Sequence, residues 1–469
     1  MTQLSTNKPM GLGGKVLFIL CAVLILDTLT AAAALGTGVI GWWLITLAAF
    51  VVPYALIATD LGTAYPSAGG LYDWVRRAFG NRMAARTSWL YWINVGLWMP
   101  AVYILFAGMF AELFLPQLPM LGRVALCLLL IWLTVWFCNI ATDIGVRISQ
   151  IGAALKILVI LVLGSAGFIH ALQHGLANQL TLHSMLPSLE GGIGFLPAII
   201  YNLLGLELVV TLGRQIKDPA RSLPRAMCCA SVLIAALYLF GTLGILAALP
   251  VEQIGLVAGL TDALRILLAG LPYSEWWVAS IGILSLLTLI GNMVSWTMGS
   301  SRTAAEAAHS GELPRWLGYT HPRFGTPVGA NVLTGSVASI VILCYALLAQ
   351  TNDELFWTVF AFSSSVFLLP YLLLFAAYLK LRLPACQEPQ PIQLPGGRMM
   401  VVLMSGSGLL LVSGALLLFL FPTLAQWQCD WQKSGPLLLG LMFTLLLGEL
   451  LLWKQGTLTL PRLKSEDPA

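Results

Sequence analysis

Charged side chains are scarce in this sequence. Asp, Glu, Lys and Arg make up 9% of the 469 residues, whereas soluble domains average about 25%. Hydrophobic residues make up 58%, and the mean hydropathy is +0.87. Apolar runs long enough to cross a bilayer recur along nearly the whole chain. The composition therefore excludes a soluble domain and predicts an all-α integral membrane protein, because a backbone inside the bilayer must satisfy its own hydrogen bonds.

Motifs for catalysis and metal binding are also missing. The chain has five histidines, no HExxH or GxSxG motif, and no paired acids spaced to hold metal ions. His170 and His174 have a spacing that can hold zinc, but no acid or cysteine nearby completes a ligand set, so a solvated outer loop explains them better. Of eight cysteines, only Cys429 falls in a predicted outer loop, which implies no disulfide framework. We expect no enzyme, metal or cofactor.

The distribution of basic residues predicts the orientation of the spans. If the N-terminus is cytoplasmic, only Arg123, Arg265 and Lys433 of the 24 lysines and arginines lie outside, and Lys156 counts among the cytoplasmic cations. Both termini are then cytoplasmic, and the net charge of +4 needs no nucleic-acid partner. The first span could be mistaken for a signal peptide, but Asp27 in its core argues against this. The twelve predicted spans are 15–36, 39–60, 88–114, 123–140, 150–171, 193–213, 225–249, 276–300, 329–350, 354–381, 400–422 and 434–454.

The sixth predicted span carries a polar cluster. Tyr201, Asn202, Gly205 and Glu207 interrupt a run of leucine, isoleucine and valine. A charge at this depth costs roughly 2.5–3.5 kcal/mol, so an acid kept there must be compensated or used. Glu207 is therefore the first functional candidate. The alternative is a protonated acid that bonds a neighbouring carbonyl and has no further role.

The first predicted span contains a second acid. Asp27, Thr28 and Thr30 precede four alanines and a run of small residues. This pattern suits a helix that breaks and exposes backbone groups to a cavity. Alternatively, these side chains bond to the neighbouring backbone and merely kink the helix.

Two other spans carry candidate cavity residues. The third contains Asn94, Trp98 and Pro100, which either line a cavity or serve ordinary helix packing. The eighth contains Trp296, which is either a lid over a bound ligand or a core or interface anchor.

Three segments resemble the amino acid, polyamine and organocation (APC) transporter superfamily, and the resemblance extends over essentially the whole chain. The first is Pro66-Ser67-Ala68-Gly69-Gly70-Leu71-Tyr72, a turn that leads into a short helix predicted on the inner membrane surface. The second joins Gly205-Leu206-Glu207 to the stretch from Lys217 to Ala226, and the third runs from Ser301-Arg302-Thr303 to Gly325-Thr326-Pro327. The chain looks most like bacterial glutamate/GABA antiporters, through Gly96-Leu97-Trp98-Met99-Pro100 and Leu394-Pro395-Gly396-Gly397-Arg398, with arginine/agmatine antiporters a near second.

The resemblance implies 12 transmembrane helices with a leucine-transporter-type 5+5 inverted repeat, broken helices 1 and 6, and helices 11–12 appended. Within it, Glu207 matches a helix 6 glutamate, Tyr201 an aromatic gate and Trp296 a tryptophan over the substrate. The implied parts are a cytoplasmic tail 1–14, repeat one 15–171, an outer loop 172–192, repeat two 193–381, a cytoplasmic loop 382–399, helices 11–12 at 400–454 and a cytoplasmic tail 455–469.

One departure from the family pattern bears on the substrate. The usual glycine-serine-glycine run at the helix 1 break is absent, and Leu26-Asp27-Thr28 stands near it. Two acids near the helix breaks favour a substrate with surplus positive charge or an amine without a carboxylate. One of the acids could carry a proton at neutral pH and release it when a cationic substrate arrives.

These observations predict a secondary active transporter of amino acids or amino-acid-derived amines in the bacterial cytoplasmic membrane. It would work by alternating access, as an antiporter or a proton-coupled symporter, on its own or as a homodimer. A polyamine or organic-cation transporter of the same fold is the alternative, and a membrane-embedded enzyme, channel or sensor lacks supporting features. The expected substrate-binding residues are Asp27, Thr28, Thr30, Tyr201, Asn202, Gly205, Glu207 and Trp296, with Asp27 and Glu207 coupling protons and Trp98 and Pro100 lining the cavity.

Overall fold

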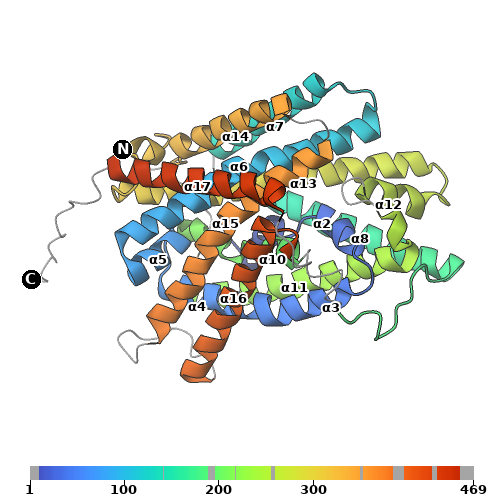
Figure 1. Cartoon of the computed structure of the whole chain (residues 1–469), viewed down its shortest axis with the longest axis horizontal. Helices are drawn as coiled ribbons and strands as arrows, with labels where there is room; N and C mark the ends of the chain where they lie inside the picture. The colour runs from blue at the N-terminus through green and yellow to red at the C-terminus, as the bar shows by residue number, and fades with distance from the viewer. Residues whose placement is uncertain are drawn as a thin grey trace, which may run out of the picture.

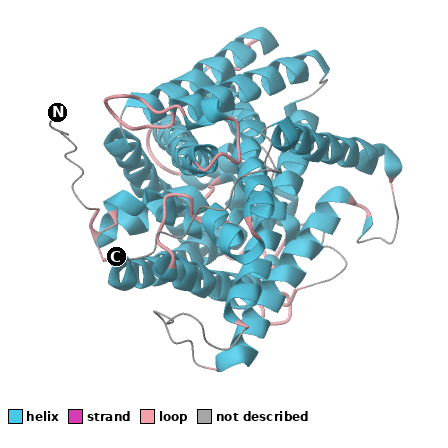
Figure 2. Ribbon diagram, turned by 90° about the vertical axis from the view of Figure 1, so that its left-hand side faces the viewer, coloured by secondary structure: helices cyan, strands magenta, loops and turns pink. Residues whose placement is uncertain are grey.

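The computed structural model of the chain describes residues 10–140, 142–187, 196–216, 218–254, 259–348, 352–383, 396–424 and 430–454. These residues form helices and loops with no strand among them, packed side by side in a bundle (Figures 1 and 2). Within this part of the chain, ten helices are long and apolar enough to cross a membrane. The predicted all-α membrane fold is confirmed.

Each of the twelve predicted spans coincides with helical structure. Three of them, 15–36, 39–60 and 193–213, consist of more than one helical piece. The pieces are α1 (Leu12–Val23), α2 (Asp27–Ala33), α3 (Val39–Thr46), η1 (Leu47–Val51), α4 (Val52–Ala64), α6 (Asn81–Phe114), α7 (Met120–Ile140), α8 (Thr142–His174), α10 (Leu196–Asn202), η3 (Leu206–Gln215), α11 (Pro219–Ala248), α13 (Ser274–His309), α14 (Val328–Leu348), α15 (Asn352–Arg382), α16 (Gly397–Leu420) and α17 (Trp431–Lys454).

The first span is broken, as its sequence predicts. α1 ends at Val23, Leu24 has an extended backbone with φ −71° and ψ 126°, and α2 begins at Asp27. The last carbonyl groups of α1 consequently have no following helical turn to bond. They need other donors.

The sixth span is broken as well. α10 ends at Asn202, and the chain resumes as a 3₁₀ helix, η3, at Leu206. Gly205 between them has φ 112°, a left-handed conformation that costs other residues roughly 1–2 kcal/mol. A Cβ at this position would also lie 2.7 Å from Cζ2 of Trp296. Glycine is thus required both for the turn and for the close approach of the indole.

The two broken helices lie near the centre of the bundle. α2 contacts α10, and α1 contacts η3, α8, α11 and α13, so both breaks meet in the interior (Figure 1). In contrast, α16 and α17 lie at the periphery, where only 33% and 28% of their apolar windows are buried within the protein. Their outward faces are apolar and suit contact with lipid.

Some connections differ from the sequence-based expectation. α8 continues to His174, so His174 belongs to a helix rather than to the expected outer loop 172–192, and its ring stacks on that of His170. An amphipathic helix, α12 (Gly259–Leu268), lies between α11 and α13 and was not anticipated. The short helix expected after the Pro-Ser-Ala-Gly-Gly turn is present as α5 (Leu71–Phe79). Cys429, the tail 455–469 and residues 384–395 of the predicted loop lie outside the described residues.

Candidate functional site

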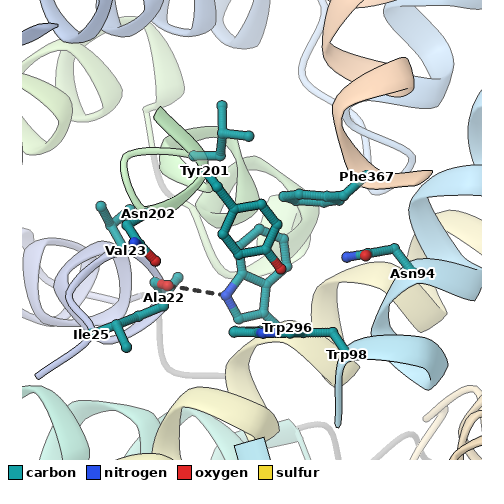
Figure 3. Close-up of a pocket in the computed structure, with 10 residues that line it drawn as sticks. Ala22, Val23, Ile25, Asn94, Trp98, Tyr201, Asn202, Trp296 and Phe367 are labelled. Atoms are coloured by element: carbon teal, nitrogen blue, oxygen red, sulfur yellow. Dashed lines mark hydrogen bonds between the residues drawn. The ribbon is translucent and has the colours of Figure 1, made fainter. Parts of the chain in front are cut away.

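A small cavity lies between the two helix breaks (Figure 3). Its volume of about 10 Å³ leaves room for about one water molecule, whereas ligand pockets measure roughly 300–1,000 Å³. Side chains therefore fill the site in this conformation. The residues that line it at the first break are Ala22, Val23 and Ile25, and those at the second break are Tyr201, Asn202 and Leu204. The others are Asn94 and Trp98 of α6, Trp296 of α13 and Phe367 of α15.

Aromatic rings form most of the cavity wall. Trp98 meets both Tyr201 and Trp296 edge to face, with ring centroids 6.0 Å apart in each pair. Phe367 contacts Trp296 at 5.1 Å and Tyr201 at 5.5 Å. These four rings come from four different helices, and Figure 3 shows them converging on one point. Such a box presents ring faces that attract a cation.

Two carboxamides supply polarity within the aromatic wall. Asn94 is 1% exposed, and neither its Nδ2 nor its Oδ1 makes a hydrogen bond of ordinary geometry among the described residues. Asn202 donates from Nδ2 to the Ala198 carbonyl at 2.6 Å, but its Oδ1 likewise has no such partner. A buried amide oxygen that accepts no well-formed hydrogen bond is costly. Both groups are available to a ligand with N–H donors.

The last carbonyl groups of α1, which have no partner within their own helix, accept hydrogen bonds from side chains of other helices. Trp296 Nε1 donates to the Ala22 carbonyl at 3.0 Å (Figure 3), and Asn292 Nδ2 donates to the Cys21 carbonyl at 2.7 Å. The Tyr238 hydroxyl donates to the Val23 carbonyl at 3.1 Å. These contacts fix the first break and tie it directly to the cavity wall.

Lys156 of α8 is the strongest donor at this break. Its Nζ lies 2.7 Å from the Cys21 carbonyl and also bonds the Leu24 carbonyl. Only 1% of Lys156 is exposed, so this residue, which the sequence analysis counts among the cytoplasmic cations, is buried between helices. In broken-helix transporters, unwound carbonyls of this kind coordinate coupling cations. Here the ammonium group of Lys156 donates hydrogen bonds to such carbonyls.

Glu207 lies in a cluster of three tyrosines rather than on the cavity wall. Its Oε1 accepts hydrogen bonds from the hydroxyls of Tyr91 at 2.8 Å and Tyr371 at 2.7 Å, and its Oε2 accepts one from Tyr54. The carboxyl group is 1% exposed. The Gly205 N–H donates to the Tyr54 oxygen at 3.1 Å, so the cluster also holds the second helix break.

The tyrosine cluster adjoins the cavity through two aromatic side chains. The Tyr91 ring lies 6.2 Å from that of Trp296, and the Tyr371 ring lies 4.9 Å from that of Phe367. A ligand that displaced Trp296 or Phe367 would therefore change the packing of the tyrosines that bond Glu207.

The other predicted site residues are placed less centrally. Asp27 begins α2, but its side chain and that of Thr28 lie outside the described ones. Thr30 is buried against α12, where a Cβ on Gly259 would touch it. Pro100 is buried inside α6 but is not among the residues that line the cavity, although Trp98 is.

Of the site residues that the sequence analysis missed, only Lys156 carries a signal in the sequence. Lys156 interrupts an apolar run, and an ionisable residue inside a span is a functional candidate by default. Tyr54, Tyr91 and Tyr371 carry no comparable signal, because tyrosine is common in membrane helices and each is more than 110 residues from Glu207 along the chain.

The sequence matches the amino acid permease family over residues 6–435. A probable agmatine/putrescine antiporter of Lactococcus lactis is 32% identical over 447 residues, which cover 95% of each chain. A glutamate/gamma-aminobutyrate antiporter of the same species is 22% identical over 79% of this chain and 75% of its own. A probable polyamine transporter of Arabidopsis thaliana is 24% identical over 75% of this chain and 67% of its own.

Proposed function

Because the chain belongs to the amino acid permease family, whose members are transporters and not enzymes, we propose that it exchanges cationic amines across the bacterial cytoplasmic membrane. The observation that carries the proposal is the aromatic cavity at the meeting point of the two helix breaks, with two amides in its wall. The probable agmatine/putrescine antiporter, similar along nearly the whole chain, supports an amine over a zwitterionic amino acid.

The chemistry of the cavity suits an ammonium or guanidinium group. The faces of Trp98, Trp296 and Phe367 attract a cation, and Asn94 and Asn202 offer acceptor oxygens for its N–H groups. None of the described lining residues is basic. Asp27 begins α2 two residues after Ile25 of the cavity wall, and its carboxylate would add the negative charge that an amine lacking a carboxylate requires.

Transport requires the cavity to change size. At about 10 Å³ it cannot hold agmatine or putrescine. We take the conformation as a closed one, in which Trp296 and Phe367 cover the site. Alternating access would open it first to one compartment and then to the other as the two broken helices move against their surroundings.

Protons are the proposed coupling ion. Glu207 is buried, and the three side chains that bond its carboxyl group are neutral hydroxyl groups. A protonated carboxyl can keep such partners, since it retains acceptor capacity and gains a donor. Lys156 occupies the carbonyls at which a sodium ion would be expected, so the proposed exchange is independent of sodium.

The proposed placement in the membrane follows the charge distribution. Both termini are cytoplasmic under the positive-inside rule, and residues 15–171 and 193–381 form the two inverted repeats. The functional unit is a monomer or a homodimer.

Proteoliposomes containing the purified protein provide the test. We expect uptake of radiolabelled agmatine or putrescine to be stimulated by unlabelled amine inside the vesicles, and to be the same with sodium or potassium outside. Glutamate or gamma-aminobutyrate exchange without amine exchange would overturn the proposal. Asp27→Asn should lower the preference for amines over amino acids, whereas Asp430→Asn, outside the spans and 33% exposed in its side chain, should leave the preference unchanged.

A further inference from the structure

A second and larger cleft, lined by other residues than the substrate cavity, lies between α6, α15 and α17. Its volume is about 280 Å³. Most of its lining residues are only partly buried, which shows that the cleft is open to the surface. α17 runs along α6 and α15 on the outside of the bundle (Figure 1). The apolar wall of the cleft includes Met83, Trp89, Leu372, Leu373, Leu445 and Leu452.

The floor of the cleft is rigid. Trp89 Nε1 donates to the Thr444 carbonyl at 3.1 Å, which joins α6 to α17. A Cβ on Gly448 would lie 2.6 Å from Cδ1 of Trp89, so glycine lets the indole approach α17 closely. A fixed apolar cleft of this size is not a good site for water, which needs polar partners. It suits a hydrocarbon chain.

The mouth of the cleft is charged. Arg86 donates from Nη2 to Glu449 Oε2 at 3.0 Å, and both side chains stay more than 40% exposed. Arg82 lies one turn before Arg86 on α6 and is exposed. Two arginines against one glutamate leave a net positive charge at the mouth, which complements an anionic group. Arginine is well suited to bind phosphate oxygens.

The lining residues of the cleft lie toward one end of their helices. Its residues come from the start of α6, the second half of α15 and the end of α17, and the charge distribution places these parts toward the cytoplasmic side. Beside it, Phe443, Leu446 and Leu450 of α17 are more than half exposed and face the lipid. An acyl chain in the cleft would therefore have its headgroup at Arg82 and Arg86.

From this arrangement we infer that the cleft binds one anionic glycerophospholipid of the cytoplasmic leaflet. One acyl chain lies along Trp89 and Leu373, and the phosphate group lies between Arg82 and Arg86. Basic pockets between helices on the cytoplasmic side bind anionic lipid headgroups in this way. The site is separate from the amine cavity, so it does not depend on the proposed function.

Lipid titration of the full-length, delipidated protein tests the inference, with bound lipids counted by native mass spectrometry. We expect one phosphatidylglycerol to bind more tightly than any phosphatidylcholine of the same chain length. Arg82→Gln should weaken phosphatidylglycerol binding about fivefold, and Glu449→Gln should strengthen it about fivefold, since each charge near the membrane surface has about this effect. Opposite signs from two mouth residues are not expected if these residues only support folding.

The cleft itself is tested by filling it. Leu445→Trp should abolish the tight phosphatidylglycerol site, whereas the matched control Leu439→Trp, at a lipid-facing position of α17 that is 73% exposed, should retain it. Equal binding of the two lipids by the wild-type protein would overturn the inference. So would a dimer that Leu445→Trp dissociates without loss of lipid binding, because the occupant would then be a second copy of the chain. If Leu445→Trp fails to fold, the two charge variants decide.

Discussion

The two helix breaks of this transporter are held by opposite kinds of chemistry. At the first, buried carbonyl groups at the end of α1 accept hydrogen bonds from side chains, and one of the donors is the ammonium group of Lys156. At the second, the carboxyl group of Glu207 accepts hydrogen bonds from three neutral tyrosine hydroxyls. Buried acceptors are satisfied at both places, but only the first contains a formal positive charge.

The difference bears on which break can change state. An ammonium group on carbonyls loses its hydrogen bonds if it moves, so the first break is anchored. A carboxyl group among hydroxyls keeps partners in either protonation state, because each hydroxyl can donate or accept. We therefore expect loss of a hydrogen-bond partner to lower stability at either break. Substitution of Lys156 should in addition create an ion dependence at the first break, and loss of the titratable group of Glu207 should change the pH dependence at the second.

The largest effect is expected for Glu207→Ala. The substitution leaves three buried hydroxyls without their common acceptor, and each unsatisfied group costs about 1–3 kcal/mol. We expect the free energy of unfolding to fall by about 3 kcal/mol or more, seen as a marked drop in melting temperature in detergent. A variant as stable as the wild type would show that the tyrosines do not depend on the acid.

Glu207→Gln is the matched variant for the same site. Its carbonyl oxygen still accepts hydrogen bonds, so the melting temperature should fall much less, but the side chain can no longer titrate. Amine exchange should then vary less with pH than in the wild type. If exchange by Glu207→Gln follows the wild-type pH profile, the second break is not where protons couple.

A smaller loss is expected for Lys156→Met. A hydrogen bond to a charged group contributes about 1.5–3 kcal/mol, and methionine fills a similar volume without a donor. We expect that loss in stability, partly recovered when sodium is present, because the freed carbonyls of Cys21 and Leu24 resemble a cation site. Lys433→Met, an exposed lysine outside the site, serves as the control. Full stability of Lys156→Met in the absence of salt would contradict the anchored first break.

Much of this site could be predicted from the sequence. Asp27 and Glu207 are out of place in apolar spans, and the helices do break beside them. Tyr201, Asn202, Trp98 and Trp296 were expected at a cavity, and they line it. Such predictions are possible because a polar group or a helix-breaking glycine in a bilayer is costly, so each such residue stands out in an apolar stretch of the sequence.

The partners of these residues could not be predicted in the same way. The sequence predicts Lys156 among the cytoplasmic cations, because sequence position gives its approximate depth but not the helix that it faces. The three tyrosines reach Glu207 from α4, α6 and α15, and their convergence depends on packing between segments more than 110 residues apart from it. Long-range packing of this kind leaves no periodic trace in a single sequence.

The smallest effect is expected for a substitution of the glycine at the second break. Gly205 has φ 112°, whereas Leu24 at the first break has φ −71°, which any residue adopts. Gly205→Ala should therefore cost about 1–2 kcal/mol from the left-handed conformation, and its Cβ would also push on Trp296, which lies 2.7 Å away. The control is Gly108→Ala in α6, where nothing lies within 4 Å of the added Cβ and alanine should stabilise the helix by roughly 0.5–1 kcal/mol. Melting temperatures that shift in opposite directions would show that the second break depends on glycine. Equal shifts would mean that the turn at Gly205 tolerates a side chain, and that the hydrogen bonds of Glu207 alone maintain the break.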